Sequence, residues 1–126
     1  MPYTVTYNPE LQVIETKAYE VLDFSEAKEI ISGIIEIGLA QKCFLCLSDY
    51  REATIRLSTM EIYEIPKIIA AIATARGLFP GSFKRALIIG RDYSDFEFLE
   101  AVTLNNMQNA KLFREFEDAK KWLLNK

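Results

Sequence analysis

The first residues of the chain alternate between polar and apolar side chains. From Tyr3 to Tyr7 the alternation has a period of two, which is the pattern of a β-strand. The next three residues, Asn-Pro-Glu, are typical of a turn, because Pro restricts φ and the Asn side chain can hydrogen-bond to its own backbone. Leu11–Glu20 is predicted as a second strand, so the first unit should be an antiparallel hairpin.

Helical spacing of apolar residues follows, and each helix is preceded by a polar residue with Glu three positions later, the pattern of a capping box. Asp23 begins the first predicted helix, which should stop near Gly38. Ser58 begins the second, and Gly77 should close it. Pro66 lies inside this second helix and should kink it or delay its start, since Pro removes one backbone hydrogen bond.

Three apolar segments are predicted as further strands. Cys43–Leu47 is apolar at every position, which suits a central strand that is covered on both faces. Ala86–Gly90 is predicted as another buried strand, and Leu112-Phe113 as a short fifth one. The polar segment Asp49–Thr54 is expected to form a loop after the first of these strands.

A third capping box at Ser94 opens a helix that should run to about Asn109, and Phe116–Leu124 forms the last helix. The predicted order is therefore β-β-α-β-α-β-α-β-α. Alternating strands and helices imply right-handed crossovers and helices on the faces of a sheet. We expect an α/β fold with a mixed, mostly parallel five-stranded sheet and four flanking helices, in a single domain over residues 1–126.

Composition narrows the function classes. The 126 residues are 50% hydrophobic and 26% charged, as in an ordinary globular domain. A net charge of −3 without a basic cluster argues against a nucleic-acid partner. No apolar stretch reaches the roughly 20 residues that span a bilayer. Because no basic leader precedes an apolar run, we expect a cytoplasmic protein.

The absence of histidine from the sequence excludes most nucleophilic chemistry. Ser-His and Cys-His pairs cannot form, nor can histidine-based metal sites. Cys43 and Cys46 are offset by three in a predicted strand, which should place their sulfurs on opposite faces as core thiols rather than as a redox pair. We therefore expect no enzyme, no metal and no cofactor.

Three segments carry a family resemblance: the hairpin Tyr7–Ile14, the stretch Asp49–Thr54 followed by Leu57-Ser58 and Glu61, and the tail Leu112–Leu123. Together they resemble the SpoIIAA-like branch of the STAS superfamily, whose members are often labelled STAS/SEC14 domain proteins. The resemblance implies a mixed sheet flanked by helices.

The resemblance also implies regulation. Anti-anti-sigma members of the superfamily bind a kinase partner, and phosphorylation of Ser or Thr at the start of the helix after strand three switches them. Their usual Asp-Ser-Ser/Thr-Gly-like run is absent here, since Ser48 precedes Asp49 and no Gly follows. Ser58 is the candidate phosphoacceptor in this chain, and its alternative role is that of a helix N-cap.

Polar residues follow the third and fourth predicted strands, where ligands commonly bind in open α/β sheets. Asp49 and Arg51 in one loop and Arg91 and Asp92 in the other could hold a carboxylate or phosphate. Alternatively, these are solvated loop residues, with Asp49 and Arg51 joined in a salt bridge.

The third predicted helix carries apolar residues over more than one face, which indicates either a partner contact or irregular core burial. The candidate partner surface consists of Phe96, Leu99, Leu104 and Met107. We expect a non-enzymatic regulatory or protein-interaction module that binds a protein partner or forms a homodimer. The alternative is a carrier of a small apolar or anionic, lipid-like ligand, which would bind at the loops after strands three and four.

Overall fold

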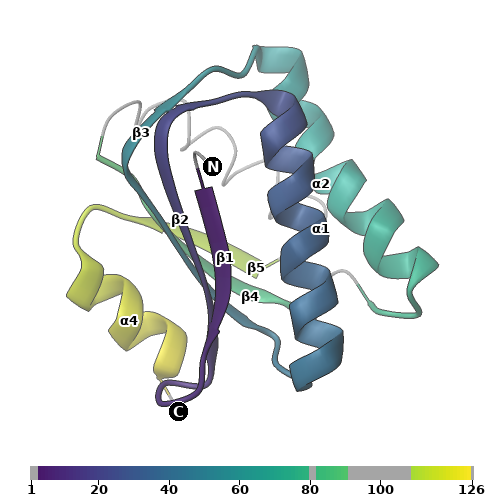
Figure 1. Cartoon of the computed structure of the whole chain (residues 1–126), viewed down its shortest axis with the longest axis vertical. Coiled ribbons are helices and arrows are strands. Elements are labelled where there is room, and N and C mark those ends of the chain that lie inside the picture. Colours follow the sequence, from purple (N-terminus) through teal and green to yellow (C-terminus); the bar gives the residue numbers. More distant parts are fainter. Residues whose placement is uncertain (1–2, 80–81, 91–108, 126) are drawn as a thin grey trace.

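The computed structural model describes residues 3–79, 82–90 and 109–125, in which three helices pack against one five-stranded sheet (Figure 1). In chain order the elements are β1 (Tyr3–Asn8), β2 (Val13–Leu22), α1 (Phe24–Gln41), β3 (Leu45–Ile55), α2 (Thr59–Ala75), β4 (Lys84–Ile88), β5 (Asn109–Phe113) and α4 (Phe116–Leu124).

The strands lie side by side in their sequence order, β1-β2-β3-β4-β5. β1 pairs antiparallel with β2, and the other three pairings are parallel. The predicted mixed, mostly parallel sheet is thus confirmed. The helix predicted from Ser94 lies outside the described residues, so the fourth helix stays a prediction. Asn109, where that helix should end, is already the first residue of β5.

The hairpin turn follows the chemistry that its residues predict. The Asn8 side-chain oxygen accepts hydrogen bonds from the backbone N–H groups of Glu10 at 2.9 Å and Leu11 at 3.1 Å. Gln12 adopts a positive φ of 58° and returns the chain to β2. The side chain of Asn8 therefore satisfies backbone donors that the turn leaves outside the ladder.

The sheet separates two hydrophobic clusters. α1 and α2 cover one face, where the larger cluster includes Ile14, Ile30 and Ile69. α4 covers part of the other face, over β3, β4 and β5, where the smaller cluster includes Leu47 and Leu123 (Figure 1). No helix in the described ranges is long and apolar enough to cross a membrane.

Both predicted capping boxes at the starts of α1 and α2 are present. The Glu26 N–H donates to Asp23 Oδ1 at 2.9 Å, and the Glu61 N–H donates to Ser58 Oγ at 3.2 Å. In each pair the Glu side chain accepts a hydrogen bond from the backbone of the cap. Pro66 lies inside α2 and does not delay the start of the helix, because α2 begins at Thr59, directly after its cap.

The prediction that α1 stops at Gly38 is wrong, since the helix continues to Gln41 and Lys42 is the left-handed cap. Gly38 is needed for close packing instead. A Cβ atom at this position would lie 2.9 Å from the Cys43 carbonyl oxygen and 2.9 Å from the Phe83 ring. Glycine is therefore required at position 38 by packing against Cys43 and Phe83, and not by the end of the helix.

β3 is longer than predicted, and the expected loop over Asp49–Thr54 does not exist. The strand runs to Ile55 because the long β2 offers partners along its whole length, with a register shift between Lys17 and Tyr19. β4 begins at Lys84 rather than Ala86 and ends at Ile88.

Cys43 and Cys46 are free and buried, as predicted for core thiols. Their placement on opposite faces is wrong, because both belong to the cluster under α1 and α2. Cys43 lies before Leu45, the first residue of β3, so the alternation of a strand does not apply to it. Its thiol donates to the Gln12 carbonyl oxygen at 3.2 Å.

Candidate functional site

Asp49 and Arg51, two of the predicted ligand-binding residues, pair with each other on β3. Arg51 Nε donates to Asp49 Oδ1 at 3.0 Å, and an Arg51 terminal nitrogen donates to Oδ2 at 2.8 Å. Burial alone would raise the pKa of Asp49, but hydrogen bonds from Arg51 outweigh it and lower this pKa. Arg91 and Asp92 lie outside the described residues, so a four-residue anion site stays a prediction.

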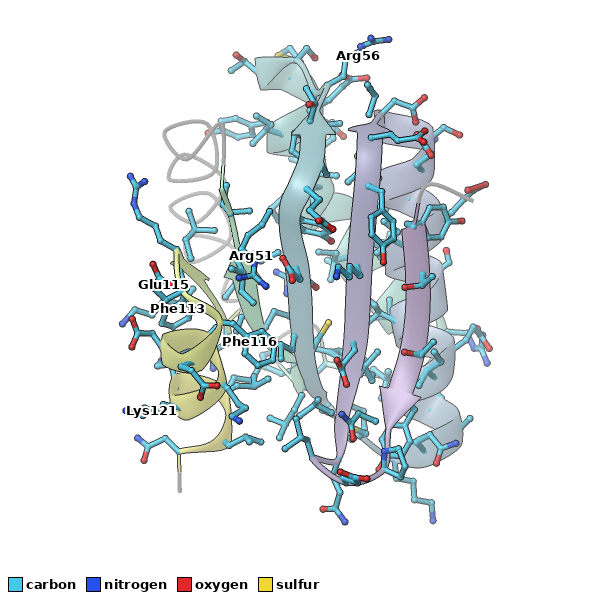
Figure 2. The ribbon with its side chains drawn as sticks, turned by 60° about the vertical axis from the view of Figure 1, so that its left-hand side comes forward. Arg51, Arg56, Phe113, Glu115, Phe116 and Lys121 are labelled. Carbon is cyan, nitrogen blue, oxygen red and sulfur yellow. The ribbon has the colours of Figure 1, made fainter. Side chains whose placement is uncertain are left out.

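Arg51 faces away from α1 and α2, on the side of the sheet that Figure 2 views, and Asp49 lines the same groove as Arg51. They line a groove of about 460 Å³ together with Thr4, Thr6, Lys17 and Phe116. We call it the open-face groove.

The charged residues along the open-face groove have oppositely charged or polar neighbours. Lys17 Nζ lies 3.7 Å from a carboxylate oxygen of Glu52, and Asn8 Nδ2 donates to Glu15 at 2.5 Å. Charges of both signs in such pairs are typical of a solvated sheet face.

Ser58, the candidate phosphoacceptor, is exposed at the start of α2 and occupies the N-cap position. The predicted role as N-cap is confirmed, and phosphorylation stays a prediction. The candidate partner surface of Phe96, Leu99, Leu104 and Met107 lies outside the described residues.

A second hollow lies on the other face of the sheet, between the sheet and the two long helices. Its volume is about 60 Å³. Its apolar walls include Ile30, Ile31 and Ile34 of α1, Ile65 of α2 and Leu87 of β4. We call this cavity the helix-side pocket.

Three polar side chains complete the wall of the helix-side pocket. Ser48 and Tyr50 come from β3, and Arg85 comes from the adjacent β4. Ser48 is 2% exposed and Tyr50 9% exposed, whereas Arg85 is partly exposed. The Ser48 hydroxyl also lies 3.4 Å from the thiol of Cys46. A hydroxyl, a phenol and a guanidinium therefore meet in an otherwise apolar wall.

Burial dominates the electrostatics of this polar group. It raises the pKa of the Tyr50 phenol and of the Cys46 thiol, so both groups keep their protons at neutral pH. It also lowers the pKa of Arg85 below its ordinary value, because the guanidinium loses hydration. A guanidinium keeps its charge even so, since its ordinary pKa is above about 12. The pocket thus presents one cation and two hydroxyl groups.

A smaller cavity of about 20 Å³ adjoins the helix-side pocket. It shares the walls Ile31, Ile34 and Arg85 with the larger cavity and is otherwise lined by apolar residues such as Phe83. Arg85 therefore lines both cavities.

Sequence reasoning missed the helix-side pocket. Its signal is weak: Ser48 and Tyr50 stand two positions apart, the spacing of side chains on one face of a strand. The assignment of residues 49–54 to a loop hid this spacing. Arg85 is notable in the sequence only as part of the dipeptide Lys84-Arg85. That its side chain lines this pocket depends on the pairing of β4 with β3.

The described residues offer no evident metal site, since nowhere among them do three or more His, Cys, Asp or Glu side chains form a group that could hold an ion. What the helix-side pocket provides is hydrogen-bond donors within an apolar wall. This arrangement can orient a small molecule that has both a polar and an apolar part.

The architecture, with one antiparallel hairpin, parallel crossovers and helices on both faces, is a SpoIIAA-like α/β fold. A solved structure with this fold is similar over nearly the whole chain. It is an uncharacterised protein of the DUF3478 family from Shewanella loihica PV-4, with a TM-score of 0.58. It is 18% identical, and the alignment covers 96% of this chain and 91% of the Shewanella chain.

Comparison by sequence gives no further assignment. No protein-family model matches the chain, and no curated protein matches it either. The structural likeness establishes the fold, which supports the resemblance noted from the hairpin and the tail.

Proposed function

We propose that the chain is a non-enzymatic, cytoplasmic binding module that takes up a small, mostly apolar molecule in the helix-side pocket. The observation that carries this proposal is the composition of the pocket wall, in which Ser48, Tyr50 and Arg85 interrupt a surface made of isoleucine and leucine. Apolar walls with a few placed polar groups are typical of ligand pockets. This changes the expected location of the ligand from the strand-exit loops to the space beneath α1 and α2.

Binding accounts for these residues better than catalysis does. Ser48 and Tyr50 have protonated hydroxyls, and no histidine exists to act as their base. Arg85 is a donor and does not serve as a general base. The polar groups can therefore hold a ligand in place without transforming it.

The size of the pocket limits the ligand. A volume of about 60 Å³ is far below the roughly 300–1,000 Å³ of typical ligand pockets. A ligand must therefore be slender, or α1 and α2 must move apart to admit it. The partly exposed residues Ala27, Ile55 and Leu57 line one part of the pocket and offer the entrance.

The test fills the pocket from this entrance. Ala27→Phe should place a ring in the opening, whereas Ala40→Phe puts the same ring on an exposed position of the same helix. The probe is the neutral fluorophore N-phenyl-1-naphthylamine, titrated into the whole chain. We expect Ala27→Phe to weaken binding about tenfold or more, which is about 1.4 kcal/mol, and Ala40→Phe to leave it unchanged. Equal binding by both variants would contradict the proposal.

A protein-interaction role is the second candidate. It is favoured by Met60 and Tyr63, which are 72% and 47% exposed and lie three residues apart on α2. Two large apolar side chains on one helix face can contact a partner or a second copy of the chain. Light scattering at high protein concentration tests the homodimer, and Met60→Glu together with Tyr63→Glu should convert any dimer to monomer.

A further inference from the structure

The polar and apolar walls of the helix-side pocket lie at different heights along the strands. Arg85 is near the beginning of β4, level with the beginning of β3. Leu22 stands opposite Ile55 at the far end of β3. Ser48 and Tyr50 fall between the two. A strand rises about 3.3 Å per residue, so the backbone positions of Tyr50 and Ile55 are roughly 16 Å apart.

The apolar end is also an open end. Ala27, Ile55 and Leu57 are partly exposed, whereas Ser48 is 2% exposed. A molecule that enters between these apolar residues meets the buried hydroxyls of Ser48 and Tyr50 at depth, beside Arg85, which is itself partly exposed. The order of the walls therefore favours a ligand that binds with its polar group inward and its apolar part toward the entrance.

The polar end has the chemistry of a carboxylate site. A carboxylate accepts hydrogen bonds through two oxygens, and the planar guanidinium of arginine can donate two parallel ones. The hydroxyls of Tyr50 and Ser48 supply further donors on the same wall. Arginine is more weakly hydrated than lysine. The partly buried Arg85 therefore loses less hydration free energy on contact with a carboxylate than a lysine would at the same position.

The small cavity next to Arg85 gives the guanidinium room to adjust. Arg85, Ile31 and Ile34 line both the cavity of about 60 Å³ and the cavity of about 20 Å³, so a movement of the Arg85 side chain would change the shape of both. Because the space beside Arg85 is small, a carboxylate fits it better than the larger phosphate group does.

From these observations we infer that the ligand is a monocarboxylate with an apolar chain, bound with its carboxylate on Arg85, Tyr50 and Ser48 and its chain toward Ala27 and Leu57. This inference rests on the proposed function, since it names the class of molecule that the helix-side pocket takes. Arg85 then determines the specificity for charge, and the isoleucine walls provide affinity for the chain.

The test compares probes with one chain length and different head groups. Octanoate, 1-octanol and octyl phosphate are titrated into the whole chain and followed by the NMR shifts of isoleucine methyl groups. We expect octanoate to bind at least about tenfold more tightly than either of the others, which corresponds to about 1.4 kcal/mol. Binding of octanol without a preference for octanoate overturns the carboxylate site and leaves the proposed function standing. If none of the three binds, the proposed function fails with it.

Variants then assign the preference to its residues. Arg85→Met should bring octanoate down to the affinity of octanol while octanol still binds, and Arg85→Lys should recover part of the preference. Lys111→Met removes a charge from an exposed position of β5 and should leave the preference unchanged. Where Arg85→Met does not fold, Tyr50→Phe and Ser48→Ala decide, since each should reduce the preference several-fold.

Three results contradict the inference. They are an undiminished octanoate preference in a folded Arg85→Met, an equal loss in Lys111→Met, and tighter binding of octyl phosphate than of octanoate. The last result would assign the polar end to a phosphate ligand.

Discussion

The two faces of the sheet use polar side chains in opposite ways. Toward α1 and α2, β3 presents Ser48 and Tyr50, which are buried in an apolar wall beside Arg85. Toward the open-face groove the same strand presents Asp49 and Arg51, which satisfy each other by hydrogen bonds of 2.8 and 3.0 Å. Charged residues are the more conspicuous in the sequence, yet the donors that lie in an apolar cavity wall are on the other face.

A polar residue says more about function when it is buried in an apolar wall than when it lies near solvent. In an ion pair near solvent, the Coulomb energy is largely offset by hydration and side-chain entropy, so such a pair is ordinary. A hydroxyl in an apolar wall loses its water and needs a hydrogen-bond partner there, as Ser48 has in the Cys46 thiol at 3.4 Å, so it is less ordinary than a surface ion pair. We therefore attach function to the buried hydroxyls and regard the pair of Asp49 and Arg51 as a brace of the strand.

The largest effect should come from the apolar wall of the helix-side pocket. Ile30 is 2% exposed, and Ile30→Ala should lower the free energy of unfolding by about 2–5 kcal/mol through lost burial and a larger cavity. Thr6→Ala on the exposed side of β1 should change it by about 0.5 kcal/mol or less. Urea denaturation of both variants provides the measurement. Similar losses would mean that the two faces do not differ as described.

Two glycines of α1 provide a sharper comparison within one helix. Gly38→Ala should destabilise by about 1–3 kcal/mol, because its methyl group meets the Cys43 carbonyl and the Phe83 ring at 2.9 Å. In Gly33→Ala the new methyl group would meet only the Val5 side chain, at an ordinary contact distance of 3.7 Å. This variant should raise the free energy of unfolding by up to about 1 kcal/mol, because alanine has the higher helix propensity. Opposite shifts of the thermal midpoint check this. A stable Gly38→Ala variant would contradict the close packing.

The smallest effect is expected at the ion pair of Asp49 and Arg51. Arg51 is 43% exposed in its side chain, so Asp49→Asn should cost less than about 1 kcal/mol. The pKa of Asp49 is lowered in the folded state, so this contribution is complete above the ordinary value of 3.8 and is lost as the pH falls through the lower, folded-state pKa. Unfolding experiments between pH 7 and pH 2 should show wild type and variant converging in acid. A constant difference would contradict the assignment.

The sequence predicts well the parts of the fold that local chemistry determines. The hairpin with Asn8 in its turn, the capping boxes of α1 and α2, and the last helix, Phe116–Leu124, are present as predicted. Each depends on residues at most a few positions apart, where turn and capping preferences act directly. The sheet topology also agrees with the prediction, because the order of strands and helices along the chain allows few topologies.

The errors concern features that depend on distant pairing. β3 continues past Leu47 because β2 lies beside it, and Gly38 is small because Phe83 packs against it. The helix-side pocket is the extreme case, since the position of Arg85 beside Ser48 depends on the pairing of two strands about 40 residues apart in the chain. Local patterns contain little information on such contacts.

The central claim is that the ligand binds on the helix side of the sheet. The most direct test is to locate the bound alkyl chain of octanoate by nuclear Overhauser effects (NOEs). With ¹³C-labelled octanoate and a protein labelled at isoleucine and threonine methyl groups, we predict intermolecular NOEs from the chain to Ile30, Ile34 and Ile65 on the helix side of the sheet. NOEs to Thr4 and Thr6 in the open-face groove, without any to these isoleucines, would contradict the account.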